Sequence, residues 1–461
     1  MNKCNWLYRT TAFMAVLACT LTFVNKAVLP LRIASYAKFS PNGKVIIDKD
    51  LLENIQHPPV VEFSLWVMES SGLAEWLLPL TVESIADAAR SRSGLGLNAE
   101  FWYDREEGEA GPTGPKHLPD SYAHTYWYVH LRELLQASEV EGKPYLSAFG
   151  RFMMRDTCIE ALKSQLEIVA LWNQHGEELS KEQITRPIVI SGPPRSMTTH
   201  AQSILANHPD VHFLRFSEGR DPLLPKDLPA DQIYSLQDPR HKILSLAKRL
   251  VSYLRPFFYY MFRFDADNMG NTPQEDIFLQ AQVFGSPQFE TNTYIPSYSQ
   301  LWHSHTNRPS YRFLKMTQQV MQWQRRQVFG KGEEGKRWLM KTPEHVGFCR
   351  DLMAVYPDAV WVLTHRDPVP VVQSFIPMIL YIQGLFNRRI DAQVFAEYQL
   401  VALEKRLTHL VEQIDSVPAS QVIHVPFQGF VRNNLEWTQK ICNFVGLRWD
   451  EQTSKVSTIF H

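Results

Sequence analysis

The stretch IVISGPPRSMTT, residues 188–199, joins an apolar run to a short polar loop. The run Ile188–Ser191 has the composition of a buried strand. Gly, Pro, Arg, Ser and Thr residues follow, and a helix is expected to begin within them. Backbone N–H groups at such a helix start bind phosphate or sulfate groups, and the helix dipole helps them to do so. The stretch therefore predicts a strand–loop–helix unit that holds an anion.

The residue types in this loop suit anion binding, but not in the way of an ATP-hydrolysing loop. We expect Gly192 to let the backbone turn and Pro194 to stiffen it. The side chains expected to contact the anion are a guanidinium and three hydroxyls: Arg195, Ser196, Thr198 and Thr199. A nucleotide-triphosphatase loop ends in Gly-Lys-Ser/Thr, where the lysine binds the terminal phosphates and the hydroxyl binds magnesium. This loop has no lysine, so we expect neither ATP hydrolysis nor a bound metal.

Met197 stands where a second glycine is expected in such a loop. If that position requires a positive φ, methionine is disfavoured there by about 1–2 kcal/mol. Because residues 196–199 should begin the helix, we expect a helical backbone at Met197. Its N–H would then still point at the anion, and its side chain would only have to turn away.

The chain around this loop alternates between short β-type runs and helical patterns. The predicted strands are residues 188–191, 211–216, 312–316, 338–341, 360–365 and 422–427, with helices such as 345–357 and 395–414 between them. This order predicts an α/β fold, with a P-loop-type parallel sheet flanked by helices. Residues 123–179 have helical spacing with Gly176 as a helix stop, so the N-terminal region is predicted to be mainly helical.

Composition and charge restrict the possible partners. The chain has 461 residues and a formal net charge of −1, so no bulk electrostatic attraction to nucleic acid is expected. We predict a signal or membrane anchor in residues 1–32, a mainly helical region in 33–180 and an α/β domain in 181–461. Residues 10–31 would associate the protein with a membrane, and the protein would otherwise be cytoplasmic. A buried amphipathic N-terminal helix is the alternative.

A second candidate anion site lies in AVWVLTHRDPVPVVQSF, residues 359–375. A strand is predicted to end near Arg366, Asp367 can cap the next helix, and Pro368 suits its first turn. Ser374 lies eight residues after Arg366, which is about two helical turns. The strand end and the helix can therefore share one phosphate, although Arg366 alone is also compatible with a surface ion pair.

Taken together and in this order, the motifs resemble the sulfotransferases that use 3′-phosphoadenosine-5′-phosphosulfate (PAPS). The resemblance rests on PIVISGPPRSMTT (187–199), LRFSEGRDPLLP (214–225), RWLMKTPEHVGF (337–348) and YPDAVWVLTHRDP (356–368) followed by Ser374. It is strongest to the bacterial-type family with an Arg-Ser-Gly-Thr-Thr loop, and tyrosylprotein sulfotransferases share that loop style. It covers about residues 126–449.

The resemblance implies a role for each matching residue. The loop residues Gly192, Pro194, Arg195, Ser196, Met197, Thr198 and Thr199 would cradle the 5′-phosphosulfate, and Arg366 with Ser374 would clamp the 3′-phosphate. Arg195 would also neutralise charge on the leaving phosphate. Glu218 would be the general base, or else a helix-cap or salt-bridge carboxylate, with Arg220 as a possible partner. Lys341 would face the sulfuryl group or the acceptor. His345 is either an alternative base or an interior residue at a helix start.

The expected activity is transfer of a sulfuryl group from PAPS to a hydroxyl-bearing acceptor: a carbohydrate, a lipid, a small alcohol or a tyrosine. Two alternatives stay open. One is a degenerate relative that binds nucleotide or a partner protein without transfer, which Met197 favours. The other is a nucleotide kinase-like enzyme, against which the missing loop lysine and the pair Arg366 and Ser374 argue. The sequence makes no prediction about oligomeric state.

Overall fold

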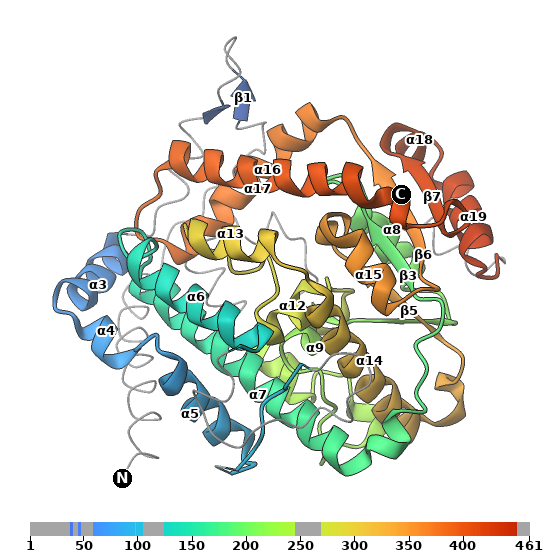
Figure 1. Ribbon diagram of the computed structural model, residues 1–461, viewed down its shortest axis with the longest axis horizontal. Coiled ribbons are helices and arrows are strands. Elements are labelled where there is room, and N and C mark those ends of the chain that lie inside the picture. Colours follow the sequence, from blue (N-terminus) through green and yellow to red (C-terminus); the bar gives the residue numbers. More distant parts are fainter. Residues whose placement is uncertain are drawn as a thin grey trace.

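The computed structural model describes residues 37–39, 45–47, 59–96, 98–104, 124–244 and 269–449. Helices lie on both sides of a central sheet, and the N-terminal helices pack along one flank of the molecule (Figure 1). The predicted anchor in residues 10–31 lies outside the described residues. The division of the chain at residues 33 and 181 stays a prediction.

The central sheet has five strands in the order β4-β5-β3-β6-β7, and every neighbouring pair is parallel. The strands are β3 (Ile188–Ser191), β4 (Val211–Phe213), β5 (Arg337–Lys341), β6 (Val360–His365) and β7 (Val422–Pro426). Strand β3 lies in the middle, where Ile188 pairs with Leu339 on one side and Val360 on the other. The predicted α/β fold with a parallel sheet flanked by helices is confirmed. Ligands of such sheets bind beyond the carboxyl ends of the strands, which here include the 192–199 loop.

The remaining elements are mostly helical. In the N-terminal region they are β1 (Ala37–Phe39), β2 (Val45–Ile47), α3 (Pro59–Ser70), α4 (Leu73–Leu77), α5 (Val82–Ser93), α6 (Tyr126–Val140) and α7 (Ala148–Leu179). After β3 they are α8 (Thr198–Leu205), α9 (Phe216–Arg220), α12 (Ile277–Gln280), α13 (Pro296–Ser304), α14 (Arg308–Phe329), α15 (Cys349–Val355), α16 (Pro368–Phe386), α17 (Ala392–Gln413), α18 (Phe427–Arg432) and α19 (Asn434–Val445). Short 3-10 turns include η5 (Gly330–Glu333) and η6 (Pro343–Phe348).

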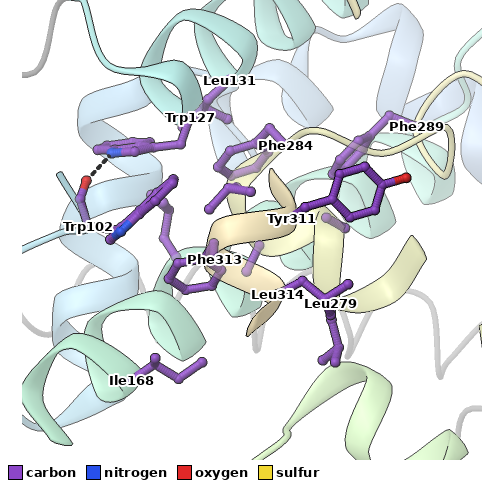
Figure 2. Packing of buried hydrophobic residues seen from close by; sticks show 14 of the residues in the cluster. Trp102, Trp127, Leu131, Ile168, Leu279, Phe284, Phe289, Tyr311, Phe313 and Leu314 are labelled. Atoms are coloured by element: carbon purple, nitrogen blue, oxygen red, sulfur yellow. Dashed lines mark hydrogen bonds between the residues drawn. The ribbon is translucent and has the colours of Figure 1, made fainter. Parts of the chain in front are cut away.

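One large apolar cluster connects the N-terminal helices to the sheet. It includes residues of α5, α6 and α7 together with residues of α14, β5 and β6. Aromatic side chains fill its centre, as Figure 2 shows. The Trp127 indole N–H donates to the Trp102 carbonyl at 2.8 Å. The Trp102 ring packs against the Phe313 ring, with 5.1 Å between the ring centroids. A buried indole needs such an acceptor, so this bond fixes α6 against the segment that follows α5.

Helix α16 has a separate apolar contact with α17. Val371, Phe375 and Ile379 of α16 share a buried cluster with Phe395 and Leu403 of α17. Among the described helices, α16 alone is long and apolar enough to cross a membrane, and 56% of its most apolar window is buried inside the protein. Its packing is that of a core helix. It also holds Ser374 beside the loop that follows β3.

Three local predictions were wrong or incomplete. Residues 312–316, predicted as a strand, lie inside α14, whose buried positions recur every three or four residues from Pro309 to Arg325. Residues 312–316 alone are too few to show the helical period of the 22-residue helix. Gly176 does not end α7, because the helix kinks at His175 and continues to Leu179. The predicted strand 211–216 stops at Phe213, since α9 begins at Phe216.

Candidate active site at the β3 loop

The loop after β3 sits directly against the end of β6. Gly192 has φ 149°, and a Cβ there would lie 2.2 Å from the Thr364 hydroxyl and 2.5 Å from the Thr364 carbonyl oxygen. Both the backbone conformation and the close approach therefore require glycine. The predicted turn at Gly192 has a second cause that the sequence did not reveal, which is this contact with a neighbouring strand.

Ser196 is part of the loop's internal structure. Its hydroxyl is fully buried, lies 2.6 Å from the Thr364 hydroxyl and donates to the carbonyl of Pro193. The predicted contact of the Ser196 side chain with an anion is therefore corrected, because the hydroxyl faces the protein interior. Pro194 is also buried. At the start of α8, Thr198 is buried and Thr199 is exposed.

Two residues of the loop have left-handed backbones. Arg195 has φ 64° and Met197 has φ 73° with ψ 17°, and Met197 is the N-cap of α8. The expectation of a helical backbone at Met197 is wrong: the helix begins one residue later. The Met197 side chain packs against the apolar cluster of β3 and α19, which offsets part of the conformational cost. Methionine thus occupies a conformation that favours glycine.

The two predicted anion-binding arginines converge on one place. The Arg195 Nε donates to the Ser374 hydroxyl at 3.0 Å, and the Arg366 guanidinium donates to the carbonyl of Arg195. Burial, followed by the positive charge of Arg366, lowers the pKa of Arg195. Two like charges held together favour an anion between them. Arg195 is therefore bonded both to Ser374 and to Arg366. The phosphate site that the sequence predicts for Arg366 and Ser374 stays a prediction.

A second polar group forms at the start of α8. Lys341, at the end of β5, donates to the Thr199 hydroxyl at 3.0 Å and forms an ion pair with Glu275. The other oxygen of Glu275 accepts from the Thr342 hydroxyl at 3.4 Å. The Glu275 side chain is 26% exposed, whereas that of Lys341 is 2% exposed. Lys341 thus links the loop to a carboxylate that solvent can reach.

Buried groups behind Lys341 hold this arrangement. The Asp276 carboxylate accepts from the backbone N–H of Lys341 at 2.5 Å and lies 3.3 Å from the His345 Nε2. The other ring nitrogen of His345 lies 3.0 Å from the Tyr311 hydroxyl. Burial is the largest influence on the pKa of Asp276 and raises it. His345 is fully buried, so these contacts match its interpretation as an interior residue at a helix start.

Glu218 lies in a different environment from the loop. It is fully buried, and its carboxylate accepts from the Arg325 guanidinium at 2.7 and 2.8 Å and from the Tyr234 hydroxyl at 2.6 Å. It also accepts from the Arg215 N–H at 2.9 Å in a capping box. Burial alone would raise its pKa, but Arg325 and the neighbouring arginines lower the pKa to about 2.

These contacts are those of a helix-cap and salt-bridge carboxylate, with Arg325 as the partner. Arg220, the partner considered from the sequence, pairs instead with Asp156 at 2.9 Å.

Sequence reasoning missed Glu275 and Thr364. Glu275 follows no predicted strand, so nothing in its surroundings marked it as a strand-end residue, and Thr364 looked like an ordinary β-branched strand residue. Within the described ranges, no group of three or more His, Cys, Asp or Glu side chains is placed to hold a metal ion. Independence of metal stays a prediction.

Replacement of Met197 measures the strain in the loop. Glycine tolerates φ 73° and alanine does not, so Met197→Gly should be more stable to unfolding than Met197→Ala by about 1 kcal/mol. Both variants lose the methionine packing, so the comparison isolates the backbone. Denaturant unfolding of the two proteins measures the difference. Equal stabilities would contradict a left-handed backbone at this position.

Removal of Arg325 tests the structural role of Glu218. Arg325→Ala leaves a buried carboxylate without its partner and should lower the free energy of unfolding by about 3–5 kcal/mol. Arg448 pairs with Asp210, and these side chains are 70% and 46% exposed, so Arg448→Ala should cost no more than about 1 kcal/mol. Thermal and denaturant unfolding measure both. A similar small loss in the two variants would refute the structural assignment.

Comparisons with known proteins identify the family and the fold of the chain. The profile of the sulfotransferase family matches residues 187–451, which is more than half of the chain. The fold is similar to that of sulfotransferase STF1 from Mycobacterium tuberculosis H37Rv, with a TM-score of 0.64 and 20% identity over 83% of this chain and 93% of that one. Sulfotransferase STF9 from Mycobacterium avium is similar with a TM-score of 0.63 and 17% identity over 82% of this chain and 87% of that one. A search of proteins with curated functions gave no match. The family profile covers the loop, Lys341, Arg366 and Ser374, and the chain belongs to the sulfotransferase family.

Proposed function

We propose that this sulfotransferase uses PAPS and transfers its sulfuryl group to the hydroxyl of an acceptor. One observation carries the proposal: two polar groups meet at the same strand–loop–helix unit. Lys341, Thr199 and Glu275 lie at the start of α8, and Arg195, Arg366 and Ser374 lie on the side of β6 and α16. PAPS has a phosphate on the 3′ side of its nucleoside and a phosphosulfate on the 5′ side. Each of the two polar groups can bind one of them.

The 3′-phosphate is proposed to bind Arg366 and Ser374, together with the guanidinium of Arg195. The Arg195 guanidinium donates to the Ser374 hydroxyl, and the Arg366 guanidinium donates to the backbone carbonyl of Arg195. Guanidinium groups and a hydroxyl are suitable donors to phosphate oxygens. The backbone N–H groups at the start of α8, the Thr199 hydroxyl and the Lys341 ammonium are proposed to bind the 5′-phosphosulfate.

Glu275 takes the place of Glu218 as the proposed general base. It is partly exposed, it lies beside Lys341, and no arginine is paired with it in the described contacts. In the reaction the acceptor oxygen forms a bond to sulfur while the bond from sulfur to the 5′-phosphate oxygen breaks. The acceptor proton moves to Glu275, and Lys341 stabilises the charge that develops at the sulfuryl and phosphate oxygens. The second product is 3′,5′-bisphosphoadenosine.

The base is tested with Glu275→Gln, which keeps the shape and an acceptor for Lys341. Turnover of labelled PAPS with a hydroxyl acceptor should fall by about 10²–10⁴-fold, because proton removal is lost. Affinity for 3′,5′-bisphosphoadenosine should change little. Glu397→Gln, on the exposed face of α17, is the control and should keep full activity. Full turnover by Glu275→Gln would exclude this carboxylate as the base.

The 3′-phosphate assignment is tested with nucleotides that differ only there. The protein should bind 3′,5′-bisphosphoadenosine more tightly than AMP by about 10–100-fold, because charge-assisted bonds are lost with AMP. Arg366→Ala should remove most of this preference, whereas Arg432→Ala, on the exposed face of α18, should retain it. Calorimetric titration without magnesium measures both affinities. An unchanged preference in Arg366→Ala would place the 3′-phosphate elsewhere.

Binding of 3′,5′-bisphosphoadenosine without turnover on any acceptor would favour the nucleotide-binding alternative, which the strained Met197 supports.

The acceptor class stays open among carbohydrate, lipid, small alcohol and tyrosine hydroxyls. Membrane association through residues 10–31 also stays a proposal, and a membrane location would favour lipid or glycan acceptors.

A further inference from the structure

The proposed base lies on a segment that crosses the carboxyl ends of β4 and β5. We call residues 272–276 the crossing segment. At its first residue, the Thr272 carbonyl accepts from the Phe216 N–H at 2.9 Å, where α9 begins. Two residues later, the Gln274 N–H donates to the Leu214 carbonyl at 2.8 Å, directly after β4. The first half of the crossing segment is therefore fixed beside β4.

The second half of the crossing segment is fixed to the end of β5. The Asp276 N–H donates to the Lys341 carbonyl at 3.2 Å, and the Lys341 N–H donates to the Asp276 carboxylate at 2.5 Å. The backbone N–H of Glu275 donates to the side-chain oxygen of Gln274 at 2.9 Å. Glu275 is thus held from both sides, and its carboxylate meets the Lys341 ammonium. The position of the proposed base therefore depends on Gln274 and Asp276.

Helix α8 holds the middle of the crossing segment through one buried side chain. The Gln202 amide donates to the Gln274 carbonyl at 2.8 Å, and Gln202 is 1% exposed. Gln202 follows Thr199 by three residues, so the two side chains lie on the same side of the helix. Thr199 accepts from the Lys341 ammonium at 3.0 Å. The helix that begins at the loop after β3 is therefore bonded both to Lys341 and to the residue before Glu275.

The chemistry of this bond explains why the side chain at position 202 carries an amide. A carbonyl oxygen only accepts, so its partner must supply an N–H or O–H. The amide supplies an N–H without charge, whereas an ammonium group here would add a positive charge one residue from Glu275 and compete with Lys341 for it. Gln202 can therefore hold the crossing segment and leave the ion pair of Lys341 and Glu275 intact.

We infer that Gln202 is a positioning residue for sulfuryl transfer. It fixes the crossing segment, and with it Glu275, relative to the helix start that is proposed to bind the 5′-phosphosulfate. The inference rests on the proposed role of Glu275 as the base. Gln202 acts through Gln274, so one helix holds both the donor and the group that takes the acceptor proton. A displacement of such a group by about 1 Å costs a reaction about 10²-fold in rate.

The first test removes the amide with Gln202→Met, which keeps the length and the apolar part of the side chain. With labelled PAPS and a hydroxyl acceptor, kcat should fall by about 10–100-fold, because the base is displaced. The KM for PAPS and the affinity for 3′,5′-bisphosphoadenosine should change little. Gln399→Met is the matched control, since Gln399 of α17 is also buried and donates to the Glu290 carbonyl at 2.9 Å. This control should keep its kcat.

A double variant separates positioning from a general loss of structure. In the Glu275→Gln protein there is no carboxylate to place, so adding Gln202→Met should lower turnover by less than about 3-fold. A merely structural role would lower turnover by the same factor in both proteins. Losses that multiply, or an equal effect of Gln202→Met and Gln399→Met, would overturn the inference and leave Glu275 as the base. Full turnover by Glu275→Gln alone would overturn both.

Hydrogen exchange followed by mass spectrometry gives an answer that does not depend on turnover. The amides of residues 272–276 should exchange faster in Gln202→Met than in Gln399→Met, because the crossing segment has lost its bond to α8. Saturation with 3′,5′-bisphosphoadenosine should slow their exchange in the unchanged protein and not in Gln202→Met. Equal exchange of these amides in the two variants would overturn the inference, even if no acceptor supports turnover.

Discussion

The contact between Gly192 and Thr364 is the constraint on which the rest of the site depends. The absent side chain at Gly192 lets the loop after β3 rest on the end of β6, at distances that no Cβ could occupy. The Thr364 hydroxyl then meets Ser196 and the Ser191 carbonyl, which fixes the loop in place. Arg366 lies two residues after Thr364, so the same contact places Arg366 beside the loop, where it donates to the Arg195 carbonyl.

Backbone strain and the repulsion of like charges both raise the free energy of the loop. Arg195 and Met197 both have left-handed backbones, and such residues persist only where their surroundings hold them. Arg366 holds the Arg195 carbonyl, and apolar packing holds Met197. The like charges of Arg195 and Arg366 also repel each other, and the anion proposed to bind here would offset this repulsion.

The sequence predicted what is local and periodic, and missed what depends on contacts between distant segments. The strands at 188–191 and 360–365 were correct because each is a short apolar run between turn signals. The false strand at 312–316 arose because five residues of α14 are too few to show a helical period. The start of α16 was predictable, because Asp367 caps the helix and Pro368 occupies its first turn.

The hydrogen-bonded surroundings of Glu218 and Glu275 were not predictable from the sequence. They depend on Arg325 and Lys341, which lie 107 and 66 residues away along the chain.

Arg195 connects separate segments of the proposed binding site. Its backbone belongs to the loop at the start of α8, its carbonyl is bound by Arg366, and its guanidinium reaches Ser374 on α16. One residue thus links the loop both to Arg366 after β6 and to Ser374 on α16. The separation of the two proposed phosphate sites is therefore tied to the position of this one residue. On the proposed function, a ligand whose two charged groups have a different separation would bind one of these sites only by displacing Arg195 from the other.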